Sequence, residues 1–307
     1  MTTIEPVPAV TPVPPRRSFA DGLRGWLPKL VLAPSFAIIL LFVYGFILWT
    51  VYLSFTSSRM LPVYKLVGFD AYVRLWSQPN WYMAIKNLAI FGVLYIGICI
   101  SIGLGLAILM DQRIRAEGVL RPIFLYPMAL SFVVTGTAWK WFLNPGLGIE
   151  NTMHNLGWES FKFDWLVNPD MAIYTVVIAG VWQASGFVMA MFLAGLRGID
   201  GEIIKAAQID GAPLTKIYRR IIIPMLRPVF LSAFIVLAHM AIKSYDLVIA
   251  LTGGGPGNAT ELPSTFMYSY TFTRSQMAVG SASAVMMLMG ITAIIVPYLY
   301  SELREKR

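Results

Sequence analysis

The chain has 307 residues, of which 57% are hydrophobic and only 13% are charged, and its mean hydropathy is +0.66. Soluble domains carry about 25% charged residues, so this composition excludes an ordinary soluble domain and indicates an integral membrane protein. One cysteine, Cys99, excludes a disulfide framework, and two separated histidines, His154 and His239, exclude a histidine metal cluster. The net charge of +8 fits a basic cytoplasmic face better than a nucleic-acid surface.

The N-terminal segment, residues 1–28, is rich in proline and lacks hydrophobic periodicity, which predicts a disordered cytoplasmic arm. The first apolar run begins at Leu30 and is too long for the core of a signal peptide. No small-residue cleavage site follows it, so the run predicts an uncleaved membrane anchor. The remaining residues, 29–307, are expected to form one transmembrane domain.

Apolar stretches recur along the chain, each near the about 20 residues that a helix needs to cross the hydrocarbon core. Within lipid the backbone can satisfy its hydrogen bonds only as a helix or a closed barrel, and stretches this long without alternation exclude the barrel. The predicted fold is therefore all-α, with six transmembrane helices at about residues 30–55, 83–110, 119–142, 171–196, 223–245 and 281–300.

Lysine and arginine are concentrated at one end of these spans. They gather before the first span, between the second and third, in the loop 197–222, and after the last span. Because cytoplasmic segments carry the excess of Lys and Arg, both termini and the 197–222 loop are predicted to be cytoplasmic. The opposite loops carry aromatic residues that suit either a headgroup belt or a soluble partner: Trp76, Trp81, Tyr82, Trp158 and Trp165.

The loop contains a basic, patterned segment, KAAQIDGAPLTKIYRRIIIP, at residues 205–224, although apolar runs flank it. Asp210-Gly211 marks a break, and Pro213 suits the first turn of a new helix. Apolar residues then follow helical spacing from Leu214 to Ile222. Two short helices with a bend between them are therefore expected at the membrane surface. They would serve either as a plug for a partner's groove or as an amphipathic connector.

The same segment resembles the EAA loop of ATP-binding-cassette importer permeases. That signature reads Glu-Ala-Ala, three residues, Gly, nine residues, and Ile-x-Leu-Pro. The matching positions, in register, are Lys205, Ala206, Ala207, Gly211, Ile221, Ile223 and Pro224. Lys205 replaces the Glu of the family and so reverses a charge, although Glu202 lies three residues earlier. Ile223 replaces Leu, which is a minor change.

The resemblance covers the chain after the N-terminal arm. Asp210-Gly211-Ala212 and the turn LTGGGP at 251–256 resemble sugar-importer permeases, and the stretches 126–146 and 184–200 resemble permeases of bacterial glucose/mannose importers. The chain is thus similar to the maltose-permease-like family of carbohydrate importers. The resemblance implies a bacterial inner-membrane subunit, with coupling to the ATPase through Lys205, Ala206, Ala207, Asp210, Gly211, Ile221 and Pro224.

The resemblance also implies partners. These are a second homologous permease, two copies of a cytoplasmic ATP-binding-cassette ATPase, a periplasmic sugar-binding protein and the lipid membrane, with no nucleic acid. The chain lacks the GxxxxGK[ST] motif, and GGGP at 253–256 has no following Lys-Ser/Thr. We therefore expect no enzyme activity, no metal and no cofactor in this chain, with ATP bound by the separate ATPase.

A glucose-like solute requires aromatic rings to stack on and polar groups to hydrogen-bond. Polar residues within spans are costly and therefore mark candidate sites. The first candidates are Trp182 and Gln183 in the fourth span, at the depth where the resemblance to maltose permeases places sugar contacts. An interhelical hydrogen bond is the alternative for Gln183.

Two further groups are candidates for substrate contact. His239, Lys243 and Asp246 close the fifth span, and the spacing of Lys243 and Asp246 suits an ion pair. A place at the outer interface is the alternative for this group. Trp139, near the outer end of the third span, suits either stacking on a pyranose or an aromatic belt.

Two other functions compete with this interpretation. A secondary carrier would show inverted repeats with interrupted helices, and no such similarity between the two halves of the chain is evident. A membrane-embedded enzyme would need clustered catalytic groups, and neither histidine has an obvious partner. A permease for an oligosaccharide or glycerol phosphate is also open, because similar groups in the membrane would bind all of these solutes.

Overall fold

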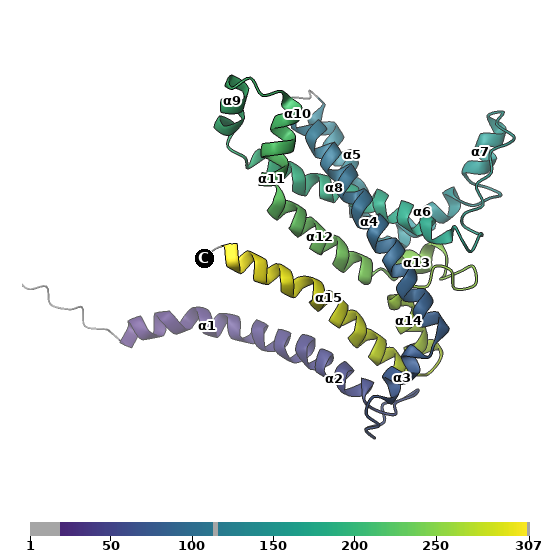
Figure 1. The fold of residues 1–307 in the computed structure, drawn as a ribbon. Helices are drawn as coiled ribbons and strands as arrows, with labels where there is room; N and C mark the ends of the chain where they lie inside the picture. The colour runs from purple at the N-terminus through teal and green to yellow at the C-terminus, as the bar shows by residue number, and fades with distance from the viewer. Residues whose placement is uncertain (1–18, 113–115, 306–307) are drawn as a thin grey trace, which may run out of the picture. The chain divides into compact units, whose positions relative to one another are not determined.

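The computed structural model of the chain describes residues 19–112 and 116–305. In these residues the regular elements are helices, apart from one isolated β-bridge between Thr56 and Leu66, so the predicted all-α fold is confirmed (Figure 1). The chain divides into two units, residues 1–49 and 50–307, which are described separately.

The first unit holds α1 (Phe19–Ile39), a π-helical turn (Leu40–Tyr44) and the start of α2 (Gly45–Ser54). The apolar stretch Lys29–Ser54, which begins in this unit, matches the first expected span. Because α1 begins at Phe19, residues 19–28 are helical where the sequence indicated a disordered arm. The prolines behind that expectation lie mostly before residue 16, and residues 19–27 contain none. The rest of the expected arm, residues 1–18, lies outside the described residues.

The second unit contains the remaining helices. Their bounds are α3 (Asp70–Trp76), α4 (Pro79–Asp111), α5 (Glu117–Ala129), α6 (Phe132–Phe142), α7 (Ile149–Asn155), α8 (Ala172–Arg197), α9 (Gly201–Ile209), α10 (Leu214–Ile217), α11 (Ile223–Met225), α12 (Arg227–Ile242), α13 (Asp246–Leu251), α14 (Pro263–Tyr268) and α15 (Met277–Glu305). π-Helical turns connect α10 to α11 (Tyr218–Ile222) and follow α14 (Ser269–Thr273).

The central helix of this unit is α8. Inside the chain, 67% of its most apolar stretch is buried, against 28% for α4. It packs along α4 and also contacts α5, α12 and α13. Its contact with α5 depends on Gly186, because a Cβ atom there would collide with the backbone carbonyl of Phe124. Large apolar side chains such as Met189, Phe192 and Leu193 fill the core around it.

The structure tests the expected spans by length and apolar character. Among the described residues, four helices could cross a membrane alone: Lys29–Ser54, Pro79–Asp111, Ala172–Arg197 and Met277–Tyr298. Two bent pairs bring the number to six if each pair is one span. The expected helix 119–142 is divided into α5 and α6, which meet at 99°, and the chain is bent by 62° before α12. The six-span count and the orientation stay predictions.

The break between α5 and α6 has a local cause. Leu130 and Ser131 are extended, with ψ of 145° and 151°, so the helix cannot continue through them. The Ser131 hydroxyl then caps α6 by accepting a hydrogen bond from the Val134 backbone N–H at 3.3 Å. Pro127 lies inside the last turns of α5. Because Pro127 and Ser131 lie within an otherwise apolar run, hydropathy alone predicts one continuous helix here.

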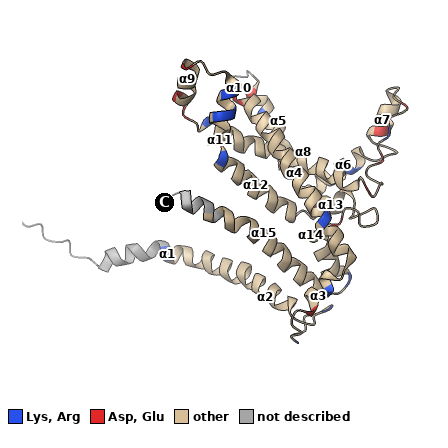
Figure 2. Cartoon of the chain, in the orientation of Figure 1, with Lys and Arg blue, Asp and Glu red and all other residues tan. Residues whose placement is uncertain are grey.

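Helix α4 defines two ends of the second unit. Its 33 residues span about 50 Å. At its first residues it packs with α3, α14 and α15 around a small core that includes Trp81, Phe266 and Tyr270. Its last residues lie near the loop that carries α9–α11 (Figure 1). Figure 2 shows Lys and Arg grouped around α10 and α11, and others around α3 at the opposite end.

The loop between α13 and α14 is held against α4. The Asn87 side-chain amide donates hydrogen bonds to the backbone carbonyls of Ala259 at 2.9 Å and Glu261 at 3.0 Å. The Glu261 side chain is buried beside them, and burial raises its pKa to about 7 despite the opposing effect of the Arg274 charge. This loop therefore holds a carboxyl group that stays neutral to a higher pH than an ordinary glutamate does.

Candidate functional site

The first candidate site is the helical hairpin at 201–224. Its first helix, α9, begins at an N-cap formed by Asp200, whose carboxylate accepts a hydrogen bond from the Glu202 backbone N–H at 2.9 Å. Glu202 in turn forms an ion pair with Lys205 at 2.9 Å. Lys205, which replaces the Glu of the EAA signature, therefore has an acidic partner, Glu202, about one helical turn earlier. Both side chains are exposed, so this pair contributes little to stability.

The turn after α9 is a Schellman motif centred on Gly211. The Ala212 N–H donates to the Ala207 carbonyl at 3.0 Å, and the Gly211 N–H donates to the Gln208 carbonyl at 3.0 Å. Gly211 has a φ of +73°, in the left-handed region that glycine adopts most readily. This turn ends α9, and Pro213 then precedes α10. The predicted pair of short helices with a bend is confirmed.

The hairpin presents apolar side chains on both sides of its turn. Ile209 is 86% exposed and Leu214 is 62% exposed. The expected coupling residues are distributed over the same surface, with Ala206, Asp210 and Pro224 exposed, Ile221 half-buried and Ala207 buried. The tip is thus apolar, and the basic residues Lys216, Arg219 and Arg220 are exposed on the helical segment that follows it.

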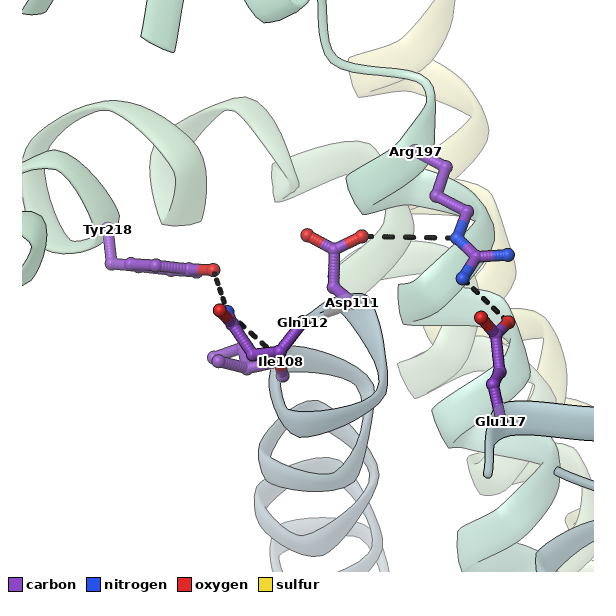
Figure 3. Close-up of polar contacts among 6 residues, drawn as sticks. All are labelled: Ile108, Asp111, Gln112, Glu117, Arg197 and Tyr218. Carbon is purple, nitrogen blue, oxygen red and sulfur yellow. Dashed lines mark hydrogen bonds and ion pairs between the residues drawn. The ribbon is translucent and has the colours of Figure 1, made fainter. Parts of the chain in front are cut away.

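Polar contacts attach the hairpin to the helical bundle (Figure 3). Gln112, just after α4, donates through Nε2 to the Tyr218 hydroxyl at 3.3 Å and to the Ile108 carbonyl at 3.4 Å. Tyr218 belongs to the second half of the hairpin, and its neighbour Ile217 is fully buried in the core. The hairpin is therefore packed into the bundle at the end of α4.

Arg197 ties three helix ends together beside this contact (Figure 3). It is the last residue of α8, and its Nη2 donates to Oε1 of Glu117, the first residue of α5, at 2.6 Å. Its Nε lies 3.9 Å from Oδ1 of Asp111, the last residue of α4. Sequence analysis did not identify this cluster, because hydropathy locates charges at span ends without indicating which of them pair.

The second candidate site is a hollow of about 170 Å³ at the junction of α12 and α13. Three predicted substrate residues, His239, Lys243 and Asp246, line it together with Phe132 of α6. The expected ion pair between Lys243 and Asp246 is wrong, since among the described residues neither side chain forms one. The helix ends at Ile242 and restarts at Asp246, so helical spacing does not relate the two side chains.

Trp139 and Trp182, predicted in separate groups, are neighbours. Their rings meet edge to face with centroids 5.8 Å apart and an interplanar angle of 72°. Trp182 on α8 is exposed, and Trp139 on α6 is half-buried. Trp139 lies two helical turns after Phe132, on the same face of α6 as that hollow-lining residue.

Gln183 does not join either group. It is only 3% exposed, and its side-chain amide donates to the Leu130 carbonyl at 2.9 Å. This is the interhelical hydrogen bond considered as its alternative role, and it fixes the extended residues between α5 and α6 to α8. Phe132 and Met240, which line the hollow, were missed because apolar residues within a span carry no distinguishing signal.

Comparison with known proteins decides the family. Residues 97–307 match the model of the family described as binding-protein-dependent transport system inner membrane component. The chain belongs to this family. A probable ABC transporter permease protein of Pyrococcus horikoshii is 39% identical over 88% of this chain and 94% of its own length. The xylose/arabinose import permease protein XacH of Haloferax volcanii is 36% identical over 88% and 86%.

The fold agrees with a solved transporter. The crystal structure of a bacterial ABC transporter involved in the import of the acidic polysaccharide alginate contains a chain that superposes with a TM-score of 0.81. The match covers 94% of this chain and 99% of that one, at 20% identity, and it shows the fold alone. The resemblance to carbohydrate-importer permeases is confirmed by the relatives. The protein is a multi-pass inner-membrane permease subunit, a transport component rather than an enzyme.

Proposed function

We propose that this permease forms the sugar pathway of an ATP-driven importer together with a second, homologous permease, and that its solute is a monosaccharide of the glucose/mannose type. The observation that carries the ATP-driven importer part of this proposal is the hairpin at 201–224. It is an ordered helix–turn–helix with an apolar tip, attached to the ends of the long helices by Tyr218 and Gln112. This arrangement suits the transfer of movement from a soluble partner to the bundle.

The partner at the hairpin is a cytoplasmic ATPase. Ile209 and Leu214 would be costly to leave in water, so they favour a surface that a partner covers. One ATPase copy would bind this hairpin and the second copy would bind the hairpin of the homologous permease. ATP is bound by these subunits, and the permease itself requires no cofactor.

The sugar pathway lies at the hollow lined by His239, Lys243 and Asp246. Its volume of about 170 Å³ is smaller than the about 300–1,000 Å³ of typical ligand pockets. A second permease facing it would complete the enclosure. The three side chains supply hydrogen bonds, and the exposed ring of Trp182 beside Trp139 offers a surface for stacking on a pyranose. Gln183 contributes by holding the start of α6 in place.

The family description supports a further partner, a periplasmic sugar-binding protein that delivers the solute. The names of the relatives support sugars as the solute class but differ in the sugar: xylose and arabinose, trehalose and maltose, and lactose. The assignment to glucose or mannose rests on the stretches 126–146 and 184–200.

Sugar uptake by the complete complex in proteoliposomes tests the proposal. The expected result is uptake of radiolabelled glucose or mannose only when both enclosed ATP and the binding protein are present. Uptake in the absence of both ATP and the binding protein would instead indicate a secondary carrier. Competition by xylose, maltose and glycerol phosphate separates the solute classes, and stronger competition by any of these than by glucose or mannose would contradict the monosaccharide assignment.

A further inference from the structure

A basic cavity of about 620 Å³ lies at the end of α4 opposite the hairpin. Three arginines from separate segments line it: Arg59 from the loop before α3, Arg74 from α3, and Arg274 from the turn before α15. Gln78 and Gln276 add side-chain amides. A single cavity thus gathers guanidinium and amide donors, the groups that bind phosphate oxygens in proteins.

The cavity lies at the edge of the membrane. Gln78 immediately precedes Pro79, where one candidate span begins, and Gln276 immediately precedes Met277, where another begins. Residues directly before a span occupy the headgroup layer, where lipid phosphates are found. The neighbouring aromatic side chains Trp76 and Tyr82 are exposed, as expected of residues in that layer.

The charges in the cavity are only partly compensated. Arg74 pairs with Asp70 at 2.7 Å. Arg274 donates to the Tyr270 hydroxyl at 3.0 Å, with its guanidinium 4.6 Å from the centre of the Tyr270 ring, and the buried Glu261 carboxyl interacts with it electrostatically. Arg59 has no acidic partner among the described residues. The positive charge of Arg59 is therefore available to an anionic ligand.

The walls of the cavity are fixed by hydrogen bonds within the chain. The backbone N–H of Met277 donates to the Arg59 carbonyl at 3.0 Å, which fixes the loop before α3 to the start of α15. The Tyr270 hydroxyl donates to the Gln78 side-chain oxygen at 2.9 Å. The segments that carry the arginines are therefore held in place without a ligand.

Apolar side chains lie in and next to the lining of the cavity. Met60, Ala278 and Val279 line it, and Leu61, Val73 and Trp76, which are close to lining residues in the sequence, are exposed. A soluble anion would gain nothing from exposed apolar side chains, whereas the acyl chains of a lipid would cover them. We propose that this cavity binds the phosphate-bearing headgroup of an anionic phospholipid of the outer leaflet. This inference does not depend on which solute the importer carries.

Binding of short-chain lipids by the full chain in a mild detergent tests the proposal. The probes are dioctanoyl phosphatidylglycerol, the phosphatidylcholine of the same length, dioctanoylglycerol, which lacks phosphate, and inorganic phosphate. We expect phosphatidylglycerol to bind more tightly than each of the others, because only it combines net negative charge with acyl chains. Equal binding of inorganic phosphate would overturn the lipid assignment and indicate a soluble anion instead.

Variants locate the site. Arg59→Gln changes a side chain without a pairing role and should weaken phosphatidylglycerol binding about fivefold, and adding Arg274→Gln should extend the loss to about 30-fold. The control is the double variant Lys140→Gln, Lys162→Gln, which removes two exposed positive charges outside the cavity and should leave binding unchanged. Thermal unfolding without lipid checks that each variant is folded.

Two results would overturn the proposal. One is a lipid affinity of Arg59→Gln equal to that of the unmodified chain. The other is a loss of lipid affinity in the lysine control as large as the loss in Arg59→Gln. In the first case, weaker capture of the purified sugar-binding protein by Arg59→Gln would show that the cavity receives an acidic side chain of that protein instead.

Discussion

The turn at Gly211 allows the sharpest test of the hairpin, because its cost can be worked out from one backbone angle. A Cβ atom at Gly211 would meet no other atom within 4 Å, so Gly211→Ala causes no collision. Its cost is the left-handed conformation at φ of +73°, about 1–2 kcal/mol. The lower entropy of the unfolded chain offsets about 0.4–1 kcal/mol of this. The ordered turn is therefore destabilised by about 1 kcal/mol, which lowers the equilibrium constant for its formation about fivefold.

Two further substitutions separate the backbone angle from side-chain size. Gly211→Asn introduces a larger side chain but should be tolerated better than Ala, because Asn adopts the left-handed region at lower cost. Gly211→Pro fixes φ near −65° and removes the N–H that donates to the Gln208 carbonyl. It should cost about 3 kcal/mol or more and abolish the turn. The expected order of transport activity is Gly, Asn, Ala and then Pro.

The assay is ATP-dependent sugar uptake by the reconstituted complex, normalised to the amount of permease in the membrane. Gly201→Ala is the matched control, since Gly201 starts α9, has ordinary backbone angles and has open space around its Cβ position. Uptake by this control should equal that of the unmodified chain. Normal uptake by Gly211→Pro at normal abundance would refute the role of the hairpin in coupling. An Asn variant weaker than the Ala variant would refute the argument from the backbone angle.

Other contacts give separate predictions. Because Glu261 keeps its proton up to about pH 7 in the folded chain, stability should fall by about 1–3 kcal/mol as pH rises from about 4.5 through 7. Thermal unfolding at pH 5 and pH 8 measures this fall, which Glu261→Gln should remove. Gly186→Val should destabilise the α5–α8 contact by about 1–3 kcal/mol, while Gly105→Val, in open space, should not; equal melting temperatures would contradict that packing. Arg197→Gln breaks half-exposed ion pairs and should change stability by about 1 kcal/mol or less, while lowering coupled uptake. Unchanged uptake together with a large loss of stability would assign Arg197 a purely structural role.

Local patterns predicted the hairpin well because they act within one or two turns. The dipeptide Asp210-Gly211 and the following Pro213 determine where α9 ends and α10 begins, and the structure places the turn there. The bend at Leu130 escaped prediction, since its extended residues lie inside an apolar run and are held by Gln183, which is distant in sequence. Hydropathy describes how long a segment remains apolar, not whether its backbone remains helical.

For the substrate candidates, too, the sequence predicted which residues matter but not how they lie relative to one another. Polarity within spans identified His239, Lys243 and Asp246, and the structure brings all three to one hollow. Their relation to one another was not predictable, because it depends on the end of α12 at Ile242 and the new start at Asp246. Trp139 and Trp182 become neighbours only through the packing of α6 against α8.

Helix α8 connects the two candidate sites. From Arg197 at the hairpin end to Trp182, it runs without interruption over about 22 Å. Because α8 is the most buried of the long helices, it is expected to move as one body. Gln183 holds Leu130, just before α6, to this helix, and α6 packs against α13, whose first residue Asp246 lines the hollow. A displacement of α8 at the hairpin would therefore move the ring of Trp182 directly, and it would move the wall formed by α6 and α13 through the Gln183 hydrogen bond and the packing of both helices against α8. Closure of the hollow then requires no bending within α8, only that these contacts persist while the hairpin moves.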